Sequence, residues 1–193
     1  MAIKYHYQER IDHLLERRIT RMESRLLMPH RADQQLHERV HAIQKKLIDR
    51  QAEKRNLKGL PQDNVDLFDQ IVATERAIIA SVEARQKDLS TYQKHVIDEA
   101  WQLEAELRVN IEKEKDLATK KGMENDLEAL KEVAQLASWR PHYYDDSTSC
   151  DRLAEAVLKV ERELYRIQRP KQLASREVFV KLAKPIELGV YAE

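Results

Sequence analysis

Two histidines and a glutamate fall within the five-residue segment HERVH, at His37, Glu38 and His41. In a helix, residues four apart share a face, so the two imidazoles could bind one Zn²⁺ while Glu38 polarised its water. However, Arg39 places a charge inside the segment, and the glycine and third histidine of the longer zinc-protease pattern do not follow. We therefore expect a solvated helix surface without metal, and a zinc peptidase is the third-ranked interpretation.

A second group of residues able to bind or react occupies positions 139–146, with the sequence WRPHYYDD. It combines aromatic rings, an imidazole and two carboxylates on an expected loop, where binding sites are common. The simpler interpretation is that Trp139 and one tyrosine close a helical bundle while the aspartates supply turn and capping chemistry. Cys150, the only cysteine, has no obvious histidine beside it and is expected to be structural rather than nucleophilic.

The composition is that of a helical protein. Of 193 residues only three are glycine and five are proline, and 35% are charged. Glycine costs about 1 kcal/mol in a helix interior, so its scarcity suits long helices. The chain begins without the apolar core of a signal peptide, and no apolar run approaches the roughly 20 residues of a membrane span. We therefore expect an all-α, cytoplasmic protein that needs no cofactor.

Apolar residues repeat at helical spacing along most of the chain. A helix is expected over residues 5–28, and a heptad seam follows over residues 36–57. A turn near residues 59–62 separates this seam from residues 62–121, which contain no glycine or proline and are expected as one continuous helix. Two such rods should pair as a long antiparallel coiled-coil hairpin, because neither can bury its stripe alone. An extended parallel homodimer is the alternative.

Gly122 is expected to interrupt the second rod. The hairpin then comprises residues 1–121, and residues 122–169 form short helices that pack on its base. Residues 170–193 form a tail rich in β-branched and aromatic side chains, which is expected to be partly extended, with a short helix packed on the base as the alternative. Since no second strand pattern is found for it, we expect the tail to dock on another chain.

Charge is unevenly distributed although the net charge is zero. Residues 1–60 carry 14 basic and 8 acidic side chains, whereas residues 61–137 carry 10 and 17. In the hairpin register this imbalance brings Arg39 near Glu83 and Arg18 near Glu104. The basic excess is thereby explained without a nucleic-acid partner.

These features predict a non-enzymatic coiled-coil adaptor or scaffold, acting as a homodimer or in a hetero-complex with protein partners. Basic residues near the turn and apolar residues of the tail are the expected partner-binding residues, on separate docking surfaces at the hairpin tip and on the tail. They are Lys45, Lys46, Lys54, Arg55, Lys58, Leu60, Val178, Phe179, Val180 and Leu182. The second-ranked interpretation is an elongated helical dimer that presents the basic residues to an anionic membrane or a filament.

Overall fold

The computed structural model describes residues 2–6, 11–61, 65–86, 95–145, 149–173 and 175–179. These residues form six α-helices, one 3-10 turn and two short strands. In chain order the elements are β1 (Ala2–His6), α1 (Ile11–Arg25), α2 (Leu36–Arg55), α3 (Leu67–Arg85), α4 (Val96–Lys113), α5 (Leu117–Leu136), the 3-10 turn η1 (Pro141–Tyr143), α6 (Cys150–Tyr165) and β2 (Ser175–Phe179). The prediction of an all-α protein is confirmed, with a single two-stranded ribbon added.

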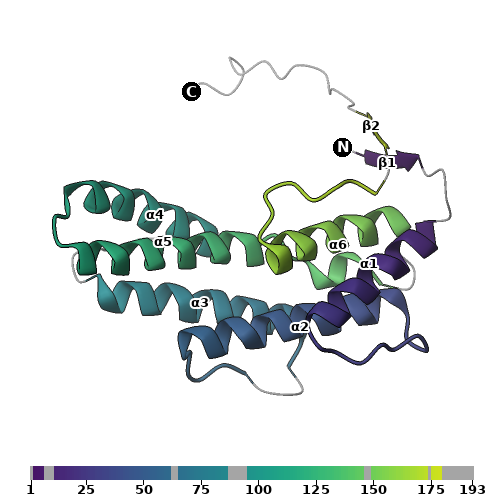
Figure 1. Ribbon diagram of the computed structural model, residues 1–193, viewed down its shortest axis with the longest axis horizontal. Coiled ribbons are helices and arrows are strands. Elements are labelled where there is room, and N and C mark those ends of the chain that lie inside the picture. Colours follow the sequence, from purple (N-terminus) through teal and green to yellow (C-terminus); the bar gives the residue numbers. More distant parts are fainter. Residues whose placement is uncertain are drawn as a thin grey trace, which may run out of the picture.

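Two groups of three helices follow one another along the long axis of the molecule (Figure 1). Helices α3, α4 and α5 pack together at one end, and α1, α2 and α6 pack together at the other. Contacts of α2 with α3 and of α5 with α6 join the two groups. One cluster of buried apolar residues, with members from all six helices, forms the core. Each helix therefore buries its apolar stripe against at least two others.

Side-chain and backbone caps explain several helix ends. Asp66 precedes α3 and accepts a hydrogen bond from the backbone N–H of Phe68 at 2.8 Å. Asp116 does the same for Thr119 at 2.7 Å, at the start of α5. At the end of α2, Asn56 adopts the left-handed conformation with φ of 51°. Aspartate before a helix and asparagine after one are the residue types that such caps favour.

The expected continuous helix over residues 62–121 is wrong. α3 ends at Arg85, α4 starts at Val96, and only residues 114–116 separate α4 from α5. The short connection brings α4 and α5 side by side (Figure 1), and Ala100, Leu103 and Leu107 of α4 are buried. Neither break coincides with a glycine or a proline. The ends of these helices are therefore determined by the burial of apolar side chains against neighbouring helices more than by local helix propensity.

Gly122 lies inside α5, so the expected boundary between residues 121 and 122 cuts through a helix. Nothing lies within 4 Å of a Cβ placed at this glycine. The glycine costs about 1 kcal/mol in helix propensity, which the apolar burial of α5 exceeds. Of the expected hairpin, the contact between α2 and α3 across the loop containing Gly59 is present, with φ of 74° at the glycine.

The charge pairs expected between the two rods are also wrong. Arg18 on α1 bonds to Glu161 on α6, and not to Glu104. Arg39 on α2 bonds to Glu23 on α1, and not to Glu83. Both arginines therefore join α1 to its neighbours in the bundle.

Part of the tail pairs with the beginning of the chain. β2 runs antiparallel to β1, with Ala2 opposite Phe179 and His6 opposite Ser175. The expectation that the tail finds no strand in its own chain is therefore wrong for these residues, and so is the helix start at residue 5. The ribbon contacts α6 and lies above the end of the bundle that α1 and α6 form (Figure 1).

Candidate functional site

The HERVH segment opens helix α2. Glu38 completes a capping box, because its carboxylate accepts a hydrogen bond from the backbone N–H of Gln35 at 3.1 Å. The rings of His37 and His41 meet edge to face, with their centroids 5.9 Å apart. Within the part of the chain that the structure describes, no three His, Cys, Asp or Glu side chains converge as metal ligands. The geometry gives Glu38 a structural role at a helix N-terminus.

His41 differs from the solvated helix surface expected for the HERVH segment. Its Nε2 lies 3.2 Å from the carbonyl oxygen of Pro141, and its ring packs against Tyr144 with centroids 4.9 Å apart. Burial lowers the pKa of His41, although the carbonyl of Pro141 favours the charged ring. The imidazole therefore connects α2 to the segment around η1.

Replacing Glu38 by alanine is expected to lower the free energy of unfolding by about 1 kcal/mol, because half of the capping box is lost. Glu38→Gln is the matched control, since its amide oxygen can accept the same backbone hydrogen bond. Urea denaturation of the two variants and the wild type measures the difference. An equal loss in Glu38→Gln would show that the negative charge, and not the hydrogen bond, stabilises α2.

Trp139 lies at the centre of the second predicted group. Its side chain is 1% exposed and that of Tyr144 is 2% exposed, whereas Tyr143 faces solvent. The hydroxyl of Tyr144 donates to Oε1 of Gln44 on α2 at 2.6 Å. The expectation that Trp139 and one tyrosine close the bundle is confirmed.

Two cavities share Trp139 and Arg140 as lining residues. The first has a volume of about 130 Å³ and opens beside Tyr143, Arg152 and Lys159. Both cations, Arg152 and Lys159, already have partners within the protein. The guanidinium of Arg152 lies 4.4 Å from the centroid of the Tyr143 ring, and Nζ of Lys159 donates to a backbone carbonyl at 2.8 Å. The second cavity has a volume of about 230 Å³ and lies between α3, the start of α4 and Trp139.

Glu75 lines the second cavity and was not singled out by the sequence analysis. Its side chain is 4% exposed, and its Oε1 is buried without a hydrogen-bond partner. Burial raises the pKa of Glu75 to about 7, against the opposing effect of Arg140 and Arg76. Nε1 of Trp139 is likewise buried without a partner. Unpaired buried polar atoms are rare in proteins, and perturbed carboxyls in cavities often mark functional sites.

The basic residues expected to bind partners are largely engaged within the chain. Lys54 bonds to Glu132 at 3.1 Å, and Arg55 bonds to the same carboxylate. Lys45 donates to Oε1 of Gln70 on α3 at 3.4 Å. These contacts neutralise part of the positive surface on which membrane binding would depend. Among the described residues, no helix is both long and apolar enough to cross a bilayer.

The other expected partner-binding residues are scattered. Lys46 and Leu60 are half-buried, and Lys58 is exposed. Val178 and Phe179 belong to β2, while Val180 and Leu182 lie outside the described residues.

Cys150 is the first residue of α6. Its Sγ lies 3.8 Å from Oδ1 of Asp12 on α1. Burial raises the pKa of the Cys150 thiol, and the carboxylate of Asp12 raises it further. The thiol is therefore not activated as a nucleophile at neutral pH.

Helix α4 carries exposed apolar side chains that the sequence analysis did not single out. Trp101 is 58% exposed and Val109 is 48% exposed, and Ala105 between them is also exposed. Their four-residue spacing places them on one face, opposite the buried Leu103 and Leu107. The signal was present in the sequence, where Trp101, Ala105 and Val109 recur at four-residue spacing.

No family model, curated protein or solved structure matches the chain. Its function is therefore inferred from the geometry and chemistry of the described residues. The described residues offer two features suited to binding: the apolar stripe of α4, formed by Trp101, Ala105 and Val109, and the cavity that contains Glu75.

Proposed function

We propose that the protein is a non-enzymatic helical adaptor that binds an amphipathic, basic-flanked helix of a partner protein on the outer face of α4. The observation that carries this proposal is the exposure of Trp101 in line with Ala105 and Val109. A partner helix laid along this stripe forms the coiled-coil type of contact expected from the sequence, with a second chain instead of within one.

The dimensions of the stripe suit a helix. Eight residues separate Trp101 from Val109, which corresponds to about 12 Å along the axis, or two helical turns. Burying a large apolar side chain completely contributes about 1.5–3 kcal/mol, and tryptophan is among the residues most often found at the energetic centre of interfaces. Helix α4 packs on α5 and α3 (Figure 1), and Trp101, Ala105 and Val109 remain exposed on its other face.

The charge of α4 determines which partner fits. The helix contains five acidic and two basic residues, and one of the basic residues, Arg108, is already paired with Glu104. Asp98 and Glu112 are exposed near opposite ends of the stripe. An antiparallel second copy of α4 would bring these carboxylates together, whereas a helix with lysine or arginine beside its apolar stripe would pair with them.

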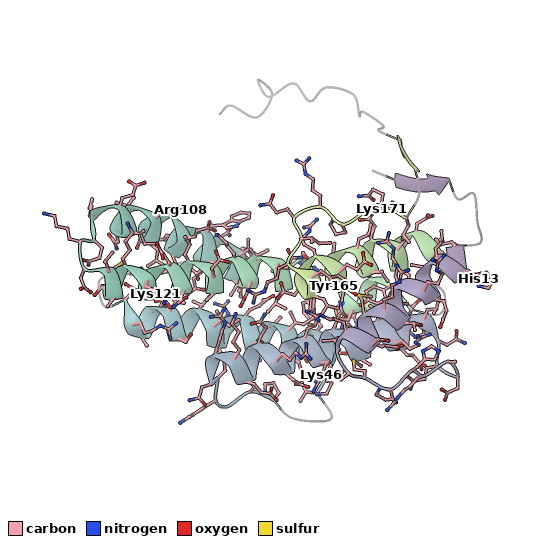
Figure 2. All side chains as sticks on the ribbon, viewed as in Figure 1. His13, Lys46, Arg108, Lys121, Tyr165 and Lys171 are labelled. Carbon is pink, nitrogen blue, oxygen red and sulfur yellow. The ribbon has the colours of Figure 1, made fainter. Side chains whose placement is uncertain are left out.

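Helix α2, which carries several of the basic residues expected to bind partners, lies on another side of the molecule from α4 (Figure 1). Figure 2 shows Lys46 on α2 and Arg108 on α4 at opposite sides of the molecule. A partner that docks on α4 therefore leaves the side of α2 that carries Lys46 free for other contacts.

Two synthetic helical peptides test the proposal. Both carry the same leucine stripe, but one is flanked by lysine and the other by glutamate. We expect the lysine peptide to bind the full-length protein and to shift Trp101 fluorescence towards the blue, because the indole leaves water. Binding should weaken at high salt, since the flanking charges are solvent-exposed.

The variant Trp101→Ser/Val109→Ser is expected to lose at least about tenfold in affinity, the equivalent of about 1.4 kcal/mol. Leu117→Ser is the matched control, because Leu117 is equally apolar and 81% exposed but lies outside the stripe. Equal binding of the two peptides, or unchanged binding by the double variant, would contradict the proposal. Dimerisation that the double variant abolishes would identify a second copy as the occupant instead.

A further inference from the structure

The cavity that contains Glu75 has the size and lining of a small-molecule site. Its volume is about 230 Å³, and its wall is mainly apolar, with Phe68, Ile71 and Val96 among the lining residues. A cavity of roughly 150 Å³ in another protein accommodates benzene. One aromatic ring or a branched aliphatic group therefore fits this space, with room for a polar substituent.

Glu75 contributes an unpaired carboxyl oxygen to the residues that line this cavity. Its Oε1 is buried without a hydrogen bond. The neighbouring Arg76 bonds instead to Glu99 at 2.7 Å, and the guanidinium of Arg140 lies 5.7 Å from the centroid of the Phe68 ring. Neither cation is paired with the carboxyl of Glu75, although buried carboxylates in proteins are normally paired.

We propose that this cavity binds a small organic amine, whose apolar group fills the space and whose protonated nitrogen donates to the carboxylate of Glu75. An ionised carboxylate only accepts hydrogen bonds, so the ligand must bring the hydrogens. A cation also supplies the charge that Glu75 lacks, and the rings of Phe68 and Trp139 attract cations. An anionic ligand would be repelled once Glu75 is ionised.

The ring of Trp139 forms part of the wall of this cavity and also of the first cavity. Recognition of the polar group of the ligand is therefore assigned to Glu75 alone.

Binding of an amine is coupled to the protonation of Glu75. Burial raises the pKa of Glu75 to about 7, and Arg140 and Arg76 oppose the shift. These two arginines act on Glu75 directly; on the facing helix α4, His95 lines the same cavity and the buried Glu99 bonds to Arg76. Since the ammonium prefers the ionised carboxylate, binding strengthens as the pH rises through 7. The ionised fraction, and with it the apparent affinity, rises about tenfold from pH 6 to pH 8.

Benzylamine is a suitable probe, and toluene is its neutral counterpart. In the full chain with Trp101→Phe, Trp139 is the only indole and reports binding by its fluorescence. We expect saturable benzylamine binding that is about tenfold tighter at pH 8 than at pH 6, and toluene binding without this pH dependence. Glu75→Gln should weaken benzylamine binding at pH 8 by at least about tenfold.

Glu112→Gln is the matched control, because this carboxyl is exposed on α4 outside the cavity. Circular dichroism establishes that each variant is folded. If Glu75→Gln does not fold, carbon NMR of the unmodified chain decides, because saturating benzylamine should lower the pKa of Glu75. The proposal is overturned if benzoate binds in place of benzylamine, if benzylamine does not bind, or if its binding is independent of pH and of Glu75.

Discussion

Replacing Arg39 by alanine is expected to lower the free energy of unfolding by about 3–5 kcal/mol, the largest effect of any single ion pair in the described bundle. The side chain of Arg39 is 1% exposed and that of its partner Glu23 is 3% exposed. Nε and Nη2 donate to the two oxygens of Glu23 at 2.8 and 2.7 Å, which is a bidentate pair. Without the guanidinium, the carboxylate on α1 remains buried and largely unpaired.

Further bonds make Arg39 the connection between α1 and α2. Its Nη1 donates to Glu16 at 2.6 Å and its Nη2 to the hydroxyl of Thr20 at 3.1 Å. His30, on the loop between the helices, lies 3.2 Å from Glu23 through its Nδ1. All the guanidinium nitrogens thus have acceptors, which is the condition under which a buried charge is tolerated.

Urea denaturation at neutral pH measures the effect. Arg108→Ala is the matched control, because Arg108 forms only an exposed pair with Glu104 one helical turn away, and such pairs contribute about 0.3–0.5 kcal/mol. The double replacement Arg39→Met/Glu23→Leu should recover most of the stability, since removing both charges leaves no unpaired group. A loss below 1 kcal/mol in Arg39→Ala would show that the pair is solvated in solution.

The contribution of this pair also depends on pH. Burial by itself would raise the pKa of Glu23, but hydrogen bonds from Arg39 and His30 outweigh it and hold the pKa below its ordinary value. A lowered folded-state pKa stabilises the protein above the unfolded-state value, and the stabilisation is lost as the pH falls through the folded-state pKa. The difference between wild type and Arg39→Ala should therefore shrink below about pH 4.

Features that depend on residues close together in the sequence could be predicted from their spacing and type. The heptad seam over residues 36–57 appears as α2, because its 4-3 spacing places Val40, Ile43 and Leu47 on one buried face. Trp139 and a tyrosine close the bundle as expected, since large aromatic side chains beside a helix end have few other places to be buried.

Features that depend on distant parts of the chain were not predictable in this way. Arg39 resembled a surface residue, because its carboxylate partners belong to another helix and no spacing rule connects them. The pairing of β1 with β2 joins opposite ends of the chain, and neither five-residue strand is distinctive alone. Glu75 resembles any helical glutamate until the bundle closes over it, so its place in the cavity had no signal in the sequence.

Replacing Trp139 by alanine is expected to cost about 3–5 kcal/mol, whereas replacing it by phenylalanine should cost about 1 kcal/mol or less. Alanine removes nearly all the apolar surface that this 1% exposed side chain buries between two cavities. Phenylalanine keeps most of that surface and also removes Nε1, a buried donor without a partner. Such a donor costs about 1–3 kcal/mol, so its removal offsets much of the lost packing.

The comparison between the two variants is therefore more informative than either alone. Trp101→Ala is the matched control for both, because Trp101 is the same residue type but 58% exposed, and its truncation should change the unfolding free energy by only about 0.5 kcal/mol. If Trp139→Phe is as destabilised as Trp139→Ala, the indole N–H must be hydrogen-bonded in solution. In that case the packing of the ring contributes less than its burial indicates.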